Sequence, residues 1–431
     1  MSQDPRLKII FLNSSFQILS KVIQFFSIMV SVPWVVSYLS IREFALYLSC
    51  SSIVGMSVIL DFGISYGLIN RMAKLDFERN GIEISDFIKQ VFGVLTIFGL
   101  FFSGLIFLSY LLIFRISLNE LLGVNRYLIV MMLCVAFSIP GVLFNRVLFA
   151  LQKGYVYSGF EGIGHLLGVF ILYGLIVLKF DLTWIVGSLF FPMFFSVILS
   201  ILYLLYNLKG FSFALISRHS SSVLSSLVPA IIDGLRYFLP QLVILGSFAF
   251  DNILILNVCG SKDAADYGVM QKLMGILVAG FSMIIAPLWP AMIKAKASGA
   301  EEWSIKISRL TFISSIIFGA IAGVLLGSFG DKLGMWWSKG YLAPASTLVV
   351  GFGLWIAIIL PAAVLGIIVN TIEGIRGRLI SISCFSIVLI IFFKLIGLYL
   401  WGSQGLVYFS TMAYFLFVAF PYYILAKKNG R

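Results

Sequence analysis

Twelve long apolar stretches follow one another along this sequence, and each is long enough to cross a lipid bilayer as a single helix. A bilayer-spanning helix needs about 20 predominantly apolar residues, and charged or Gly/Pro-rich breaks separate the runs. Their length favours helices, because the strands of a membrane barrel would show shorter segments of alternating polarity. The predicted spans are 12–38, 44–69, 88–114, 127–150, 156–178, 182–206, 230–258, 264–291, 307–329, 347–370, 379–401 and 404–426.

The composition excludes a water-soluble globular protein. Of 431 residues, 61% are hydrophobic and 11% are charged, whereas soluble domains carry about 45–50% apolar and about 25% charged residues. Twelve spans leave roughly 14 residues for each loop or tail, which is too few for a catalytic or nucleotide-binding domain outside the membrane. We therefore predict an all-α polytopic membrane protein that is not an enzyme and holds no cofactor.

The excess of positive charge indicates orientation in the membrane rather than binding to nucleic acid. The formal net charge is +12, from 30 Lys and Arg against 18 Asp and Glu. With the N-terminus inside, nineteen basic residues fall in cytoplasmic segments, seven on the opposite side and four within spans. Because cytoplasmic loops are enriched in Lys and Arg, both termini are predicted to be cytoplasmic, with an uncleaved first span.

The two halves of the chain match each other when one is shifted by 220 residues. Residues 42–47 (REFALY) then align with residues 262–267 (KDAADY), and Lys74 aligns with Lys294. Such a duplication predicts two six-helix bundles related by a pseudo-two-fold axis along the membrane normal, with a cavity between them. The predicted domains are an N-terminal bundle at 1–207, a cytoplasmic linker at 208–229 and a C-terminal bundle at 230–431.

Four basic residues inside predicted spans are candidates for an anion-binding cavity. A charge near the centre of a membrane helix costs about 2.5–3.5 kcal/mol on insertion scales, so each one needs a reason. Fixed positive charge in a low-dielectric cleft attracts anions, and both Lys and Arg bind phosphate readily. The alternative is structural pairing of each base with an acid. The candidates are Lys21, Arg236 and Lys272, with Lys394 either in the same lumen or as a satellite.

A polar stripe along the first span contains Lys21. Its members recur every three or four residues and therefore share one face of the helix. Such a face must contact protein or water within the bilayer, and we place it on the wall of the central cavity. The stripe consists of Asn13, Gln17, Ser20, Lys21, Gln24, Ser27 and Ser31.

Four further titratable residues in spans are candidates for coupling to an ion, H⁺ or Na⁺, or for gating. Carboxylates and His inside membranes mark proton or cation relays, and the i,i+4 spacing of Glu161 and His165 allows the two side chains to share a proton. Structural pairing is again the alternative for each residue. The candidates are Asp61, Glu161, His165 and Asp251.

Other motifs predict packing rather than chemistry. Gly164 with Gly168 and Gly323 with Gly327 have the four-residue spacing that lets apolar helices approach closely. The four cysteines lie inside apolar runs without paired spacing, so we expect neither disulfides nor a metal site.

Three segments of the chain resemble a known family. They are 38–63 (YLSIREFALY leading to LDFG), 145–155 (NRVLFALQKGY) and 250–290, with FDNI, ADY and PLWP. They resemble the O-antigen or capsule repeat-unit flippases of the multidrug/oligosaccharidyl-lipid/polysaccharide (MOP) exporter superfamily, over nearly the whole chain. The motif positions that match include Asp61, Arg146 and Asp251, and Arg146 joins the basic residues expected in the cationic cavity.

This resemblance implies twelve helices in two bundles that form a V in the bacterial inner membrane. It also implies flipping of undecaprenyl-pyrophosphate-linked oligosaccharide by ion-coupled alternating access. The expected partners are the lipid-linked substrate, membrane lipids, and a polysaccharide polymerase with its chain-length regulator, but no nucleic acid; we expect a monomer. The alternatives are a multidrug or cation antiporter of the same superfamily and a membrane polysaccharide polymerase.

Overall fold

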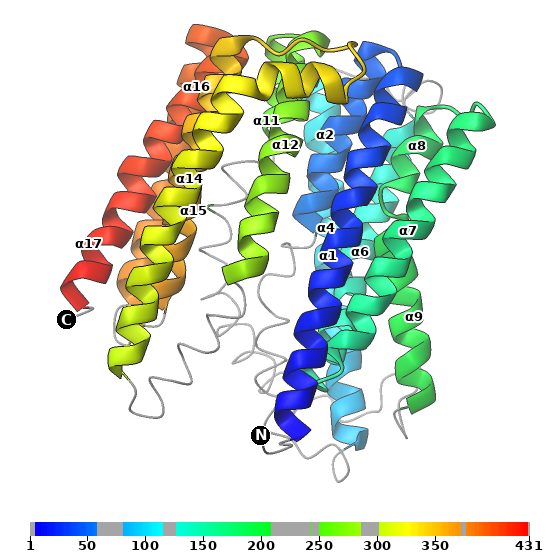
Figure 1. Ribbon diagram of the computed structural model, residues 1–431. Helices are drawn as coiled ribbons and strands as arrows, with labels where there is room; N and C mark the ends of the chain where they lie inside the picture. The colour runs from blue at the N-terminus through cyan, green and yellow to red at the C-terminus, as the bar shows by residue number, and fades with distance from the viewer. Residues whose placement is uncertain are drawn as a thin grey trace. The chain divides into compact units, whose positions relative to one another are not determined.

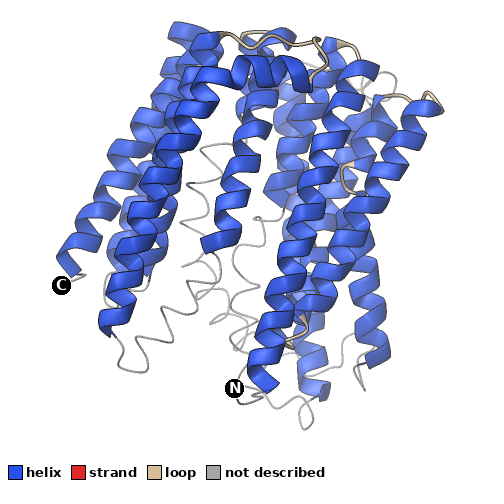
Figure 2. Cartoon of the chain, in the orientation of Figure 1, coloured by secondary structure: helices blue, strands red, loops and turns tan. Residues whose placement is uncertain are grey.

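The chain folds into helices throughout the part that the structure describes. The computed structural model describes residues 5–57, 81–114, 126–207, 243, 250–285, 301–370, 372 and 376–429, and their regular elements are all helical (Figures 1 and 2). This confirms the predicted all-α fold class. The helices are α1 (Pro5–Tyr38), α2 (Ile41–Ser57), α4 (Gly81–Phe114), α6 (Arg126–Ala150), α7 (Gly154–Val177), α8 (Leu182–Ser188), α9 (Phe191–Asn207), α11 (Asp251–Val258), α12 (Ser261–Ile285), α14 (Glu301–Trp337), α15 (Ser346–Asn370), α16 (Arg376–Tyr414), the π-helix η1 (Phe415–Ala419) and α17 (Phe420–Asn429).

Among the described residues, seven helices are long and apolar enough to cross a membrane, and up to eight if the bent pair α8–α9 is one span. One of the seven is the stretch Gly377–Lys428, which has 52 residues. A straight helix of that length would measure about 78 Å, more than twice the hydrocarbon core of about 30 Å. The stretch is in fact interrupted, because Trp401 and Gly402 have non-helical dihedral angles. It therefore provides the last two predicted spans.

The turn at Gly402 folds these two spans back on each other. Gly402 has φ +66° and ψ −146°, a conformation that glycine adopts more readily than other residues because it lacks a Cβ. On either side of the turn, Gly397 and Gly405 lie so close that a Cβ on one would collide with the backbone of the other. The two spans are thus packed with their backbones in contact.

The sixth predicted span differs from the prediction, because it is broken. The sequence predicts one helix over 182–206, whereas α8 and α9 meet at an angle of 46°. Pro192 lies at the break, in the first turn of α9. Because proline has no backbone N–H and its ring clashes with the preceding turn, a straight helix cannot continue through this position.

The helix boundaries support the predicted duplication. The helices α1 and α11 end at Tyr38 and Val258, and the helices that follow begin at Ile41 and Ser261. Both pairs of boundaries are 220 residues apart. The central helices α6 and α15 also each contain a proline, Pro140 and Pro361. These matching boundaries and prolines of the described helices are what a duplication predicts.

The chain divides into two compact units. Unit 1 consists of Met1–Trp34 and Cys50–Phe238, and unit 2 of Val35–Ser49 and Leu239–Arg431. In unit 1, α6 packs against α4, α7, α8 and α9, and in unit 2, α15 packs against α12, α14, α16 and α17. Each unit is thus built around one central helix. The junction of α1 and α2, which the sequence assigns to the N-terminal bundle, groups with unit 2.

Both predicted glycine motifs lie at close helix contacts. A Cβ on Gly323 would come within 2.5 Å of the carbonyl oxygen of Gly353, where α14 crosses α15. A Cβ on Gly164 would come within 2.8 Å of the carbonyl oxygen of Pro192 on α9. The predicted packing role of these glycines is confirmed.

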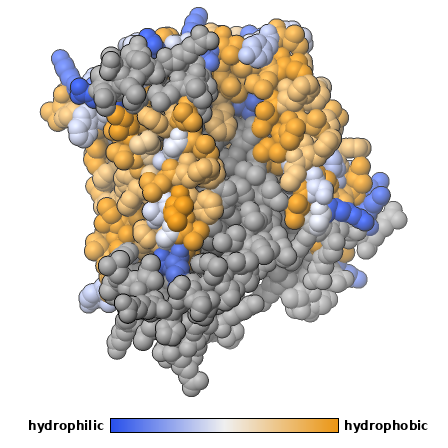
Figure 3. All heavy atoms as spheres, turned by 180° about the vertical axis from the view of Figure 1, so that it is seen from behind, coloured by the Kyte–Doolittle hydropathy of each residue, from blue (hydrophilic) through white to orange (hydrophobic). Residues whose placement is uncertain are grey.

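Large apolar side chains cover the described surface. Phe170, Leu178, Val324 and Val388 are among many that are exposed, and the coloured atoms of the face in Figure 3 are mostly hydrophobic. Continuous apolar surface of this extent is rare on soluble monomers. Such a surface is typical of a multi-pass membrane protein, which this chain is.

Candidate functional site

The polar stripe of α1 faces α7 within unit 1. Near the start of α7, the Asn13 side-chain oxygen accepts the Tyr155 backbone N–H at 2.7 Å, so it satisfies one of the amide groups that a helix start leaves free. Further along α1, the Ser27 hydroxyl donates to the carbonyl oxygen of His165 at 3.3 Å. These stripe residues thus contact protein, one of the two environments that the sequence allows; the place of the stripe on the wall of a central cavity stays a prediction.

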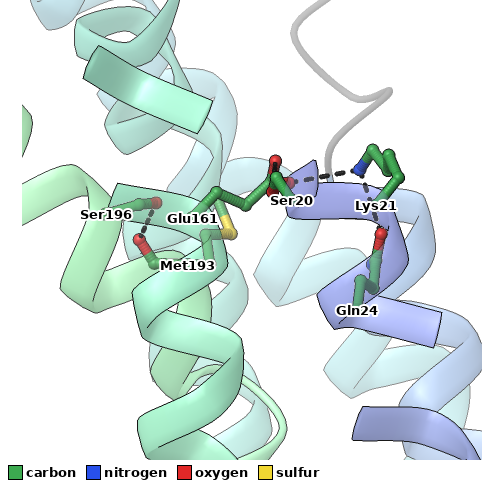
Figure 4. A network of polar contacts seen from close by, with 6 residues as sticks. All are labelled: Ser20, Lys21, Gln24, Glu161, Met193 and Ser196. Carbon is green, nitrogen blue, oxygen red and sulfur yellow. Dashed lines mark hydrogen bonds and ion pairs between the residues drawn. The ribbon is translucent and has the colours of Figure 1, made fainter. Parts of the chain in front are cut away.

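Lys21 and Glu161 form an ion pair between α1 and α7 (Figure 4). The Lys21 Nζ lies 3.3 Å from Glu161 Oε1 and also donates to Gln24 Oε1 at 3.0 Å. The Ser20 hydroxyl donates to Glu161 Oε2 at 3.0 Å. The side chains of Lys21 and Glu161 are 35% and 16% exposed. The Lys21 side chain is therefore not enclosed while it is paired.

Other predicted site residues surround Glu161. His165, one turn along α7, and Tyr157, one turn earlier, both interact with it electrostatically. Arg146 on α6 interacts electrostatically with Tyr157. Unit 1 thus brings Lys21, Glu161 and His165 together, and Arg146 interacts with Tyr157 of the same group. Tyr157 was not predicted as a member of this group, although its position four residues before Glu161 places it on the same helix face.

Unit 2 contains a second ion pair, which is fully buried. Lys394 on α16 forms a salt bridge and hydrogen bond with Asp251 Oδ1, and the Tyr267 hydroxyl of α12 donates to Asp251 Oδ2 at 2.5 Å. The side chains of Lys394 and Asp251 are 2% and 0% exposed. This contact favours the structural pairing that the sequence left open for both residues, and their roles in a cationic cavity or in ion coupling stay predictions. Tyr267 was not predicted as a partner, although it aligns with Tyr47 in the repeat.

The same helices carry another polar link and the base Lys272. The Asn252 amide donates to Gln271 Oε1 at 2.8 Å, which ties α11 to α12. Lys272 follows Gln271 and is half-buried. No ion pair of Lys272 occurs with any residue in the described part of the chain. The remaining candidates, Arg236 and Asp61, lie outside the described residues.

Sequence comparison alone identifies no relative of this chain. No protein-family model matches it, and no curated protein has a significantly similar sequence.

Solved structures, in contrast, resemble it over nearly its whole length. An inward-facing multidrug resistance MATE family transporter of the MOP superfamily matches with a TM-score of 0.69 at 14% identity, covering 96% of this chain and 98% of the other. The lipid II flippase MurJ, in an inward closed conformation, matches with a TM-score of 0.68 at 14% identity, covering 97% of this chain and 87% of the other. A MOP superfamily transporter from Pyrococcus furiosus matches with a TM-score of 0.62 at 13% identity, covering 98% and 95%.

These likenesses show the fold. The chain has the twelve-helix, two-bundle fold of MOP superfamily transporters, as its apolar runs and its duplication predict.

Proposed function

We propose that this protein is a flippase that moves undecaprenyl-pyrophosphate-linked oligosaccharide, an O-antigen or capsule repeat unit, across the bacterial inner membrane. The observation that carries the proposal is the sign of the charges in its apolar helices. Among the described candidates, the bases Lys21, Arg146, Lys272 and Lys394 outnumber the acids Glu161 and Asp251. Positive charge at low dielectric attracts a pyrophosphate anion. The fold is compatible, since it resembles that of a lipid II flippase.

In the proposed cycle, the pyrophosphate binds Lys21 and its neighbours while the lipid tail stays in the bilayer. A bound ligand shifts a conformational equilibrium only by its difference in affinity for the two states. Release on the other side therefore requires that the outward-facing state holds the phosphate less tightly. Binding of H⁺ or Na⁺ at a carboxylate and its later loss supply that difference, because the site holds the phosphate less tightly once the carboxylate is negatively charged again. Both termini lie in the cytoplasm in this proposal, and the chain acts alongside a polysaccharide polymerase and its chain-length regulator.

A multidrug or cation antiporter is the second candidate, because the fold is also that of a multidrug transporter. An exporter of organic cations needs acidic groups to attract them, whereas bases prevail here. For the Pyrococcus furiosus transporter, a reverse polarity of the binding pocket suggests a different function. Pocket polarity is thus the property by which we choose between the two candidates.

Replacement of Lys21 by Ala tests the flippase proposal. We expect Lys21→Ala to abolish surface polysaccharide in a complemented deletion strain while the protein level in the membrane stays normal. Lys332→Ala, which removes an exposed lysine, is the matched control and should retain polysaccharide. Wild-type polysaccharide in the Lys21→Ala strain, together with drug hypersensitivity of the deletion strain, would contradict the proposal in favour of the antiporter. Translocation of lipid-linked oligosaccharide by reconstituted protein under a proton or sodium gradient identifies the coupling ion.

A further inference from the structure

The contacts of Lys21 show a cation that is held by one carboxylate but not enclosed. An ammonium group has three N–H donors, and the described contacts of Lys21 are to Gln24 and Glu161. Its side chain is about twice as exposed as that of Glu161, 35% against 16%. Because these two contacts leave a third N–H donor and the side chain is not enclosed, a second anion can bind at the Lys21 ammonium.

A phosphate anion at Lys21 competes with Glu161. Two anions at one ammonium repel each other, and the repulsion is strong where water is scarce. Protonation of Glu161 removes its negative charge and with it the ion pair, so Lys21 becomes available. The charged and titratable groups that interact with Glu161 are Lys21 on α1 and Tyr157 and His165 on α7, and Arg146 of α6 interacts with Tyr157.

We propose that Glu161 is a built-in competitor for the phosphate of the ligand at Lys21. The carboxylate occupies the ammonium when the site is empty, and a proton taken up by Glu161 releases Lys21 to bind the phosphate. The loss of that proton restores the ion pair and expels the anion. No covalent bond changes apart from the O–H bond of that proton, which enters from water and later returns to it. This inference rests on the proposed function and assigns the step that couples ion and substrate to one side chain.

Ser20 has a defined part in this exchange. Its hydroxyl donates to Glu161 Oε2, the oxygen that does not contact Lys21. A hydrogen bond to the charged form of a carboxylate stabilises that form. Ser20 therefore favours the paired state, and its removal should shift the competition toward the phosphate without removing any charge.

Binding of inorganic pyrophosphate to the purified full chain in phosphatidylcholine nanodiscs tests the inference. We expect Glu161→Gln to bind pyrophosphate about tenfold more tightly than the wild type, because one charge-assisted bond no longer competes. The ratio of the two affinities should approach one as the pH is lowered into the range in which carboxylates take up protons. Protonation of pyrophosphate itself cancels in this ratio.

The double variant separates competition from a structural effect. If Glu161 acts through Lys21, Lys21→Ala should weaken binding, and Lys21→Ala/Glu161→Gln should bind no better than Lys21→Ala alone. Ser20→Ala is the second variant, to be used even if Glu161→Gln does not fold, and should tighten binding about twofold to threefold. In transport, Glu161→Gln should bind substrate well but release it slowly, so that the maximal rate falls while the apparent affinity rises.

The ways in which the inference can fail are distinguishable. Equal or weaker binding by Glu161→Gln, with weaker binding by Lys21→Ala, overturns the competition but leaves the flippase proposal in place. Absence of any Lys21-dependent pyrophosphate binding overturns both. In a third outcome, Glu161→Gln leaves the affinity for pyrophosphate unchanged but raises the affinity for phosphatidylglycerol added to the nanodisc. Competition at Lys21 then stands, but its ligand is a phospholipid headgroup, and the proposed flippase function fails.

Discussion

The two ion pairs of this protein join equivalent helices but differ in polarity and burial. In unit 1, the base Lys21 lies on the first span and the acid Glu161 on the fifth. In unit 2, the acid Asp251 lies on the first span of the repeat and the base Lys394 on the fifth. The unit 1 pair is partly exposed, whereas the unit 2 pair is at most 2% exposed.

This difference indicates different roles. Removal of one partner of a buried ion pair leaves an uncompensated charge in the interior and destabilises strongly. A partly exposed pair contributes little net stability where water reaches and screens both charges, as it does in the proposed cavity. The unit 2 pair therefore holds α11, α12 and α16 in one arrangement, while the unit 1 pair can open at low cost. A side chain that must exchange partners during transport needs the second kind of environment.

The largest expected effect is that of breaking the buried pair. Asp251→Ala leaves the Lys394 ammonium buried without its carboxylate, and we expect a loss of about 3–5 kcal/mol in the free energy of unfolding. Unfolding by titration with a denaturing detergent measures it. The double variant Asp251→Leu/Lys394→Leu should be more stable than Asp251→Ala, since it leaves no buried charge without a partner. A loss below about 1 kcal/mol for the single variant would show that the two pairs do not differ in kind.

Tyr267→Phe sharpens the comparison by removing only the third member of the buried group. The hydroxyl donates to a carboxylate oxygen that is shielded from water, and loss of such a bond costs about 1–3 kcal/mol. Tyr47→Phe is the matched control, because Tyr47 is the repeat counterpart and is also buried, with its ring 6.3 Å from that of Phe44. Equal losses of unfolding free energy in the two variants would mean that the hydroxyl of Tyr267 adds nothing to the buried pair.

Much of the fold follows from the sequence because hydrophobicity is a local property. The predicted span 347–370 agrees with α15 (Ser346–Asn370), and the predicted break at 402–403 adjoins the turn at Gly402. The ends of α14 were not predictable in the same way. This helix begins at Glu301, six residues before the predicted span, because a helix can continue beyond the bilayer where its residues are charged. Hydropathy predicts which residues lie in the hydrocarbon core, but it does not predict where the helix ends outside it.

Which embedded charges pair with each other could not be predicted from the sequence, for a different reason. Each charged residue is identifiable as an anomaly in an apolar run, and the polar stripe of α1 predicts that one helix face contacts protein. The partners, however, are 140 residues apart for Lys21 and Glu161 and 143 residues apart for Asp251 and Lys394. Only the three-dimensional packing of the helices decides which acid meets which base. The local spacing suggested Glu161 with His165, whereas the described hydrogen bonds of Glu161 from other helices come from Ser20 and Lys21.

The smallest expected effect on stability is that of Lys21→Ala, and it is the most informative about function. Glu161 keeps its hydrogen bond from Ser20 and is 16% exposed, so it is not stranded when the ammonium is removed. If the pair lies in the proposed water-filled cavity, we expect the free energy of unfolding to change by less than about 1 kcal/mol, the range of solvent-screened pairs, although polysaccharide export is lost. The same detergent titration as for Asp251→Ala measures the change, with Lys332→Ala as the control for loss of a lysine. A loss as large as that of Asp251→Ala would instead make Lys21 a structural residue, since a side chain whose removal unfolds the protein is not free to exchange Glu161 for a phosphate.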